Sequence, residues 1–184
     1  MANIQLSVDL GSKFITICQK AVGLVLREPC IAIAQKTKDR YELREVGFRA
    51  ESIISTALGG AKVVCPVQEG FIVDEEMFTL LLKAFLEKIL PTSFIKPRVK
   101  AIVNITCAMT NSDRRAVEKC FVSAGVKEVI LVESPLSMLA YTGSIGGMFV
   151  DIGAGKTEIA SVTNRGIASG VAVNIAAYRA QRLY

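Results

Sequence analysis

The sequence predicts an α/β protein in which helices cover a mixed β-sheet, followed by the opening strands of a second domain of the same kind. Two observations support this prediction. Strand-like apolar segments alternate with segments of helical apolar spacing through the middle of the chain. In addition, the pattern of apolar strand, aspartate and glycine turn occurs twice, at 8–17 and at 149–160. We therefore expect a first domain over 1–145, with a small insertion around 36–70, and the first strands of an incomplete second domain over 146–184.

The N-terminal third predicts short antiparallel strands, because its apolar runs lie between glycine, proline and charged positions. Strands are expected at residues 4–8, 14–19, 23–26 and, after Pro29, 30–34. The charged segment 36–40 is predicted to be a solvated turn rather than a nucleic-acid contact, since it has no aromatic platform. A strand at 41–47 and a helix at 50–58 should follow, ahead of an irregular connection through Pro66.

Asp74 is predicted to cap a long helix whose first turn is acidic, which favours the positive end of the helix dipole. The apolar residues of this helix recur at helical spacing, so they should face the core. They are Met77, Phe78, Leu81, Leu82, Phe85 and Ile89. Pro91 should end the helix, and a strand is expected at 99–105.

Two further helices are predicted from their start signals. Thr110 and Asp113 form a capping box for one of them, and Pro135 suits the first turn of the other. The apolar segment 128–132 between them predicts a buried strand. The second glycine turn should then form a hairpin of two strands, and a third strand is expected after it at 167–173.

Composition limits the chemistry available to the chain. Its 184 residues are 51% hydrophobic and 21% charged, as in globular proteins. The net charge of +5 comes from scattered cations, so it gives little support for a nucleic-acid partner. The absence of histidine excludes Ser-His or Cys-His catalysis and histidine-bound metal. Five separated cysteines, no secretion signal and no apolar run of about 18 residues predict a cytoplasmic location.

The second glycine turn does not match the better-known phosphate motifs. A P-loop would need glycine five positions before Gly155, where Val150 stands, and a dinucleotide motif would need glycine where Glu158 stands. Both motifs also lead into a helix, whereas residues 157–162 alternate as a strand does. The turn is therefore predicted to belong to a β-hairpin.

A glycine hairpin can still bind phosphate, because backbone N–H groups can converge on an anion that approaches closely. The aspartates at the strand ends, Asp9 and Asp151, suit Mg²⁺, which favours carboxylate and water oxygens beside phosphates. The alternative is two ordinary Asp-Gly hairpin turns. The repetition of the whole pattern favours the phosphate-binding interpretation.

These residues resemble the actin and Hsp70 ATPase superfamily, and most closely its bacterial MreB branch, over nearly the whole chain. Both aspartate–glycine turns resemble the phosphate motifs of the superfamily. Three connecting segments, 23–29, 110–117 and 132–135, resemble MreB in particular. The resemblance implies an actin-like, ribonuclease H-like α/β domain with a mixed five-stranded sheet flanked by helices. It also implies an ATP-binding cytoskeletal protein involved in cell shape, which forms filaments at the inner face of the cell membrane.

Carried over by position, the resemblance implies contacts to the phosphates of ATP from both turns. These residues are Gly11, Ser12 and Lys13 on one side and Gly153, Ala154, Gly155, Lys156 and Thr157 on the other. It assigns Mg²⁺ to Asp9 and Asp151. Glu133 falls where the family places the residue that orients the attacking water, a positioning task of phosphoryl transfer. The alternative role for Glu133 is a helix cap before Pro135.

Phe94 and Ile95 lie between two prolines and are followed by cations, which suits a peripheral contact with an anionic membrane. The MreB family carries an apolar pair in this loop that enters lipid. The alternative is a loop that places its aromatic residue in the core. The implied partners are other copies of the chain or a full-length homologue, and no nucleic acid is expected.

The chain also departs from the family. Lys13 and Lys156 stand where small or hydroxyl residues are usual, so they would either strengthen phosphate binding or crowd the phosphate and Mg²⁺. Ala154 replaces a glycine and should avoid positive φ. The sequence stops at Tyr184, within the second domain, so we expect weak ATP binding and negligible hydrolysis by this chain alone.

Three alternatives stay open at this level. The chain could be a non-enzymatic interaction module that pairs exposed apolar strands with a partner. It could be a truncated gene product without a function of its own. The division actin FtsA and Hsp70-type chaperones share the phosphate turns but fit the connecting segments less well.

Overall fold

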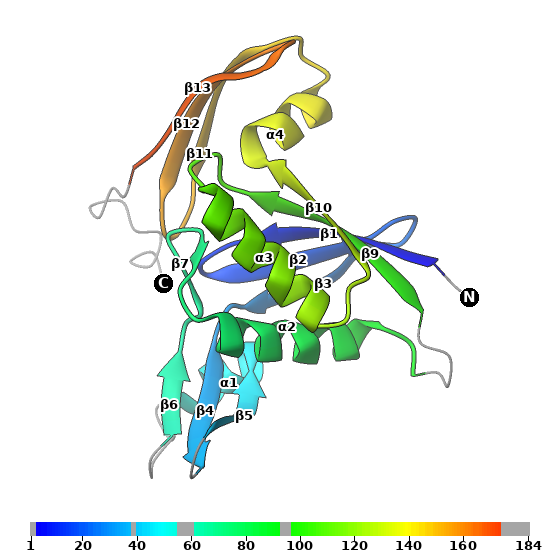
Figure 1. Ribbon diagram of the computed structural model, residues 1–184, viewed down its shortest axis with the longest axis vertical. Coiled ribbons are helices and arrows are strands. Elements are labelled where there is room, and N and C mark those ends of the chain that lie inside the picture. Colours follow the sequence, from blue (N-terminus) through cyan, green and yellow to red (C-terminus); the bar gives the residue numbers. More distant parts are fainter. Residues whose placement is uncertain (1–2, 38–39, 55–60, 93–96, 174–184) are drawn as a thin grey trace.

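The fold is built around one five-stranded sheet. The computed structural model describes residues 3–37, 40–54, 61–92 and 97–173. Its main sheet has the order β10-β9-β1-β2-β3 (Figure 1). The strands are β1 (Asn3–Leu10), β2 (Phe14–Gln19), β3 (Gly23–Pro29), β9 (Arg98–Ile105) and β10 (Glu128–Glu133). The first three strands form an antiparallel meander, whereas β1, β9 and β10 run parallel, so the predicted mixed sheet is confirmed.

One face of this sheet carries the hydrophobic core. Every second residue of β1, from Ile4 to Leu10, is buried, and the residues between them, including Asp9, belong to the other face. Helices α2 (Glu75–Ile89) and α3 (Asn111–Ser123) pack on each other beside the buried face (Figure 1). The alternation within β1 therefore separates the core from the polar residues that face the site.

The helix signals of the sequence are confirmed. The Asp74 Oδ1 atom accepts the Met77 N–H at 2.9 Å, and the predicted apolar residues of α2 are buried except for Ile89, which is half-buried. Thr110 and Asp113 form the predicted capping box of α3, with both reciprocal bonds present. Helix α4 (Ser134–Thr142) has Pro135 in its first turn.

A separate three-stranded sheet lies partly within the region predicted as an insertion around 36–70. It has the order β5-β4-β6, with strands β4 (Ala32–Thr37), β5 (Arg40–Val46) and β6 (Ala61–Val64). Helix α1 (Gly47–Ile53) begins earlier than the predicted 50–58. The Phe48 N–H donates to Glu28 Oε2 at 2.9 Å, which satisfies one of the N–H groups that a helix start leaves free. Residues 55–60, the end of the predicted helix, lie outside the described residues.

Two short strands, β7 (Val67–Gln68) and β8 (Phe71–Ile72), form a small hairpin between β6 and α2. The predicted turn at 36–40 lies between strands β4, which continues to Thr37, and β5, which begins at Arg40, and residues 38–39 lie outside the described residues. The pairing between these strands extends to Thr37 and Arg40.

The second glycine turn joins two strands of a further antiparallel sheet, as predicted. This sheet contains β11 (Gly147–Ile152), β12 (Thr157–Thr163) and β13 (Gly166–Val173) in that order. The prediction that the strand at 128–132 is buried is wrong. Strand β10 lies at the edge of the main sheet and is half-buried, with the Ile130 side chain 50% exposed.

Candidate functional site

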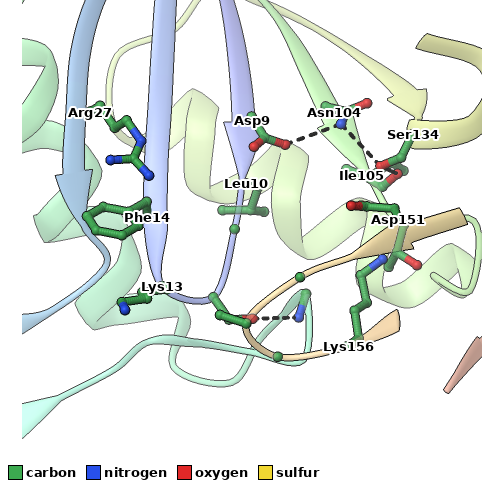
Figure 2. A pocket seen from close by; sticks show the side chains of 17 residues that line it. Asp9, Leu10, Lys13, Phe14, Arg27, Asn104, Ile105, Ser134, Asp151 and Lys156 are labelled. Atoms are coloured by element: carbon green, nitrogen blue, oxygen red, sulfur yellow. Dashed lines mark hydrogen bonds between the residues drawn. The ribbon is translucent and has the colours of Figure 1, made fainter. Parts of the chain in front are cut away.

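The two predicted phosphate turns lie at the same cleft, although some 140 residues separate them in the sequence (Figure 2). The first turn joins β1 to β2 and the second joins β11 to β12. The cleft has a volume of about 330 Å³. The residues that line it are Asp9, Leu10, Gly11, Ser12, Lys13, Phe14, Arg27, Gly70, Asn104, Ile105, Thr106, Ser134, Asp151, Gly153, Ala154, Gly155 and Lys156. All the residues predicted to bind phosphate or metal are therefore brought together, except Thr157, which is buried at the start of β12.

The two turns touch each other through Gly155. A Cβ atom at this position would lie 2.5 Å from Ser12 Oγ and 3.0 Å from the Glu69 backbone nitrogen, so only glycine allows the approach. Ser12 Oγ in turn accepts the Gly70 N–H at 3.0 Å. Three segments that are distant in sequence thus form one wall of the cleft. Ala154 has no positive φ, as predicted.

An amide network fixes Asp9 at the other side of the cleft. Asn104 is paired with Asp9 in the register of the parallel strands β1 and β9, and its Nδ2 donates to Asp9 Oδ1 at 3.2 Å. The same Nδ2 donates to Ser134 Oγ at 3.1 Å, while Ser137 Oγ donates to Asn104 Oδ1 at 2.9 Å. The amide orientation is set by these partners. Figure 2 shows Asp9, Asn104 and Ser134 in this arrangement.

Asp151 carries its charge in a partly buried position. Burial raises the pKa of its carboxyl above the ordinary value, the Lys156 ammonium acts in the opposite direction, and the negative charges of Asp9 and Glu158 raise it further. The Asp9 and Asp151 carboxylates are thus two like charges at one cleft, and a cation near them would be favoured.

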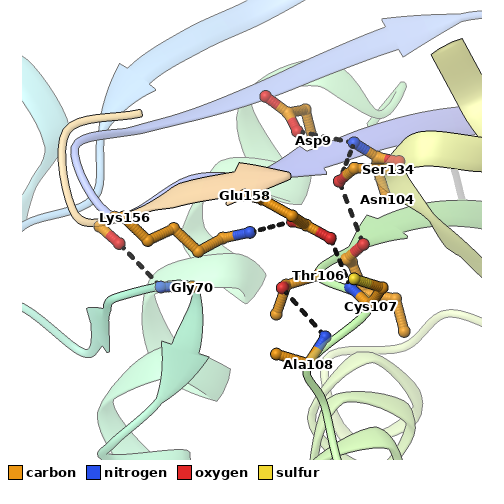
Figure 3. A network of polar contacts seen from close by, with 11 residues as sticks. Asp9, Gly70, Asn104, Thr106, Cys107, Ala108, Ser134, Lys156 and Glu158 are labelled. Atoms are coloured by element: carbon orange, nitrogen blue, oxygen red, sulfur yellow. Dashed lines mark hydrogen bonds and ion pairs between the residues drawn. The ribbon is translucent and has the colours of Figure 1, made fainter. Parts of the chain in front are cut away.

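Lys156 is held by a fully buried carboxylate. Its Nζ forms an ion pair with Glu158 Oε2, and the Cys107 N–H donates to Glu158 Oε1 at 2.8 Å (Figure 3). Burial alone would raise the pKa of Glu158, but the bonds from Cys107 and Lys156 outweigh it and lower the pKa. The pKa of the Cys107 thiol rises to about 12, through burial and the adjacent Glu158. Cys107 therefore stays protonated, and its backbone N–H holds the carboxylate.

Two cations besides Lys156 line the cleft. The Arg27 guanidinium stacks on the Phe14 ring at 4.0 Å from the ring centroid, and Lys13 Nζ lies 5.8 Å from the same centroid. Among the described residues, the charged groups that line the cleft are Lys13, Arg27 and Lys156 together with Asp9 and Asp151.

Glu133 is not among the described residues that line the cleft. Its carboxylate forms an ion pair with the Arg114 guanidinium on α3, and both side chains are mostly buried. The next residue, Ser134, lines the cleft instead and donates to the Ile105 carbonyl at 3.1 Å. The catalytic role of Glu133 stays a prediction. Phe94 and Ile95, the predicted membrane contact, lie outside the described residues.

The donor set suits Mg²⁺ only in part. Asp9 and Asp151 supply two carboxylates at one cleft, which is the small protein contribution that Mg²⁺ takes beside phosphates and water. Within the described ranges, no cluster of three or more His, Cys, Asp or Glu residues could hold a metal ion. When bound, Mg²⁺ would neutralise phosphate charge, and this chain would contribute Asp9 and Asp151 to it.

Sequence reasoning did not single out Asn104, Arg27 or Glu158 as site residues. Asn104 is a polar residue near the C-terminal end of an apolar parallel strand, where ligands of α/β sheets commonly bind, so its position carried a signal. The sequence carried no such signal for Arg27 and Glu158, because their partners Phe14 and Cys107 come from other parts of the chain.

Comparison of the chain with known proteins shows the family to which it belongs. The family model described as MreB/Mbl protein matches residues 3–181. The chain belongs to the MreB/Mbl family. It is 29% identical over 182 residues to the cell shape-determining protein MreB of Escherichia coli K12, covering 95% of this chain. It is 28% identical over 177 residues to the Mbl protein of Bacillus subtilis 168, covering 93% of it. The chain spans about half the length of these curated relatives, 52% in both cases.

Solved structures show the same actin-like fold. The MreB5 protein of Spiroplasma citri, in a crystal structure bound to ADP, superposes with a TM-score of 0.80 at 21% identity, over 94% of this chain and 52% of that one. A MamK double helical filament superposes with a TM-score of 0.74 at 16% identity, over 94% and 55% of the two chains. The predicted resemblance to MreB and the predicted fold class are confirmed. Within the described part of the MreB/Mbl chain, no helix is long and apolar enough to cross a membrane.

Proposed function

We propose that this MreB/Mbl chain binds the phosphates of ATP weakly in the cleft between its two glycine turns, as an actin-like protein of the cell-shape cytoskeleton. The observation that carries the proposal is the convergence of both turns, with Asp9 and Asp151, on one cleft. MreB5 of Spiroplasma citri was crystallised with ADP and with AMPPNP, which supports a nucleotide as the ligand.

The charges and size of the cleft favour phosphates over the whole nucleotide. Among the described residues that line the cleft are Lys13, Arg27 and Lys156, the last already paired with Glu158, and such cations suit phosphate oxygens. Its volume of about 330 Å³ is at the lower end of the roughly 300–1,000 Å³ found for small-molecule sites. We therefore expect most of the binding free energy to come from phosphate contacts and the affinity to be low.

Hydrolysis by this chain alone should be negligible. Among the described residues that line the cleft, the carboxylates are Asp9 and Asp151, both proposed to hold a cation. Glu133, predicted to orient the attacking water, is engaged by Arg114. Because phosphoryl transfer depends on positioning the water and the phosphate together, binding without that positioning gives little rate.

Titration of the ¹⁵N-labelled chain tests the proposal. Tripolyphosphate and ATP should shift the backbone amide signals of residues 11–13 and 153–156 with similar dissociation constants, on the order of 1 mM. Adenosine should leave these signals unchanged. Micromolar affinity for ATP would contradict weak binding, and unchanged signals at about 10 mM tripolyphosphate would contradict phosphate binding itself.

A second candidate function is self-association through the sheet β11–β13. In the register of this sheet, Val150, Ile159 and Val171 form a row on one face, and they are 52%, 41% and 60% exposed. Met148 and Ile152 extend the same face, at 75% and 67% exposed. Such a patch is typical of an interaction surface. Sedimentation that depends on protein concentration without nucleotide would support this function, and filaments that require ATP would support the actin-like one.

The filament and membrane partners are proposals as well. MamK forms a double helical filament, which supports assembly of this chain with copies of itself or with a full-length homologue. A peripheral contact at the inner face of the cell membrane through Phe94 and Ile95 is proposed from the sequence alone. Replacing both residues with serine should weaken binding to anionic liposomes without unfolding the protein. Loss of the fold would instead assign the pair to the core.

A further inference from the structure

Arg27 reaches the cleft from the third strand of the main sheet. In the register of the antiparallel strands it is paired with Thr16 on β2, and Thr16 is paired with Asp9 on β1, so the three residues share the face opposite the core. The Arg27 guanidinium lies 4.0 Å from the centroid of the Phe14 ring, and Phe14 directly follows the first glycine turn. The Arg27 side chain therefore extends from β3 over β2 towards that turn.

Phe14 gives the guanidinium a platform that a second ring supports. The Phe14 ring packs against Phe48, with the centroids 6.3 Å apart and an interplanar angle of 51°. A guanidinium stacked on an aromatic ring keeps its N–H groups at its edge, where they can donate two parallel hydrogen bonds to a phosphate. Stacking thus orients Arg27 without using its hydrogen-bond donors.

The positive charge of Arg27 is not taken up by a neighbouring carboxylate. Among the described residues, no ion pair includes Arg27. The adjacent Glu28 is bonded elsewhere, because its Oε1 accepts from Lys88 Nζ at 2.6 Å and its Oε2 accepts the Phe48 N–H at 2.9 Å. The guanidinium therefore remains available to an anion in the cleft.

Arg27 lies apart from the second glycine turn. Figure 2 shows Arg27 and Phe14 on one side of the first turn and Lys156 and Asp151 on the other. The lining of the cleft extends over the sheet from Asn104 on β9 to Arg27 on β3, which is three steps between neighbouring strands, or about 14 Å. A single phosphate cannot contact both ends of this span, whereas an extended chain of phosphates can.

We propose that Arg27, oriented by Phe14, forms an outer phosphate subsite of the cleft and makes it select a linear chain of three phosphates over shorter anions. The ligand class is the triphosphate chain that inorganic tripolyphosphate and nucleoside triphosphates share. This inference rests on the proposed binding of phosphates between the two glycine turns, and it adds the residue that determines the preferred chain length.

Amide-shift titrations with pyrophosphate and tripolyphosphate at constant ionic strength test the subsite. Arg27→Gln should lose roughly tenfold of its affinity for tripolyphosphate and less than about threefold for pyrophosphate. Phe14→Leu keeps an apolar side chain but removes the platform, so it should lose at least about threefold for tripolyphosphate. Arg44→Gln is the matched control, because it removes an exposed arginine from β5 in the other sheet and should leave both affinities unchanged.

A direct readout comes from the guanidinium itself. The Nε–Hε signal of Arg27, assigned by its loss in Arg27→Gln, should shift on addition of tripolyphosphate. An unchanged signal, or an equal loss of affinity for both anions in Arg27→Gln, would overturn the inference while tripolyphosphate binding by the unmodified chain upholds the phosphate site. If the unmodified chain does not bind tripolyphosphate at all, both proposals are rejected.

Titration with ATP and ADP identifies the source of the triphosphate. For a nucleoside triphosphate, Arg27→Gln should weaken ATP binding by roughly tenfold and ADP binding by less than about threefold. For an inorganic polyphosphate, the loss should be seen with tripolyphosphate and not with ATP. Either result supports the subsite, and an Arg27→Gln variant that binds ATP and tripolyphosphate as the unmodified chain does would overturn it.

Discussion

The contact between the two glycine turns makes Gly155→Ala a sharp test of the cleft. The new Cβ atom would lie 2.5 Å from Ser12 Oγ, 3.0 Å from Ser12 Cβ and 3.0 Å from the Glu69 backbone nitrogen. Rotation of the Ser12 hydroxyl could relieve the closest contact, but it would break the bond from the Gly70 N–H and cost about 1 kcal/mol. The contact with the backbone would persist. We therefore expect a total destabilisation of about 1–3 kcal/mol.

Urea unfolding, followed by circular dichroism, measures this change in the free energy of unfolding. The same variant should weaken tripolyphosphate binding, because the two turns must move apart. Gly153→Ala is the matched control in the same turn, since the nearest atom to its new Cβ, the Lys156 carbonyl oxygen, is 3.3 Å away. Its effect should be smaller.

A double-mutant cycle then identifies the contact responsible. Ser12→Gly removes both side-chain atoms that the new methyl group meets, so it should recover part of the stability lost in Gly155→Ala. Coupling of at least about 0.5 kcal/mol is expected for residues in contact. Two results would refute the packing of the two turns against each other. One is a Gly155→Ala variant as stable as Gly153→Ala, and the other is that the stability changes of Gly155→Ala and Ser12→Gly simply add.

Three further predictions concern other parts of the fold. Thr110→Ala removes the cap of α3, so it should lower the free energy of unfolding by about 0.5–2 kcal/mol, as measured by thermal denaturation. A free energy of unfolding equal within error to that of the unmodified chain would contradict the capping box. Glu133→Gln should leave the dissociation constant for tripolyphosphate unchanged in the amide-shift titration, and a clear loss of affinity would show that Glu133 reaches the ligand. Burial raises the pKa of the Cys30 thiol to about 12. At pH 8 we therefore expect iodoacetamide to modify the exposed Cys65 of the native chain before Cys30, and mass spectrometry measures the two rates. Equal rates would contradict the burial of Cys30.

Local signals in the sequence predicted most of the framework. The cap at Asp74 and the capping box at Thr110 were predicted correctly because each depends on residues only three positions apart. The strand containing Ile130 was predicted to be buried, but an apolar run does not reveal whether a strand lies at an edge of the sheet. That placement depends on which other strands pair with it.

The candidate site was predicted in its glycines and aspartates but not in all of its side-chain directions. Glu133 and Ser134 are neighbours at the junction of β10 and α4, and only Ser134 lines the cleft. Glu133 ends β10 and Ser134 begins α4, so the directions of their side chains depend on how the helix leaves the strand. The catalytic role of Glu133 stays a prediction, and its ion pair with Arg114 on α3 is a contact that the sequence did not indicate.

The way the cleft is assembled has a consequence for synthesis on the ribosome. Among the described residues, its lining begins at Asp9 and ends at Lys156, and translation at about 5–20 residues per second separates these two positions by roughly 7–30 s. During that interval the early strands exist without the turn that closes the cleft. A polyphosphate therefore cannot help the nascent chain to fold before residue 156 has left the exit tunnel, and any stabilisation by the ligand acts only afterwards.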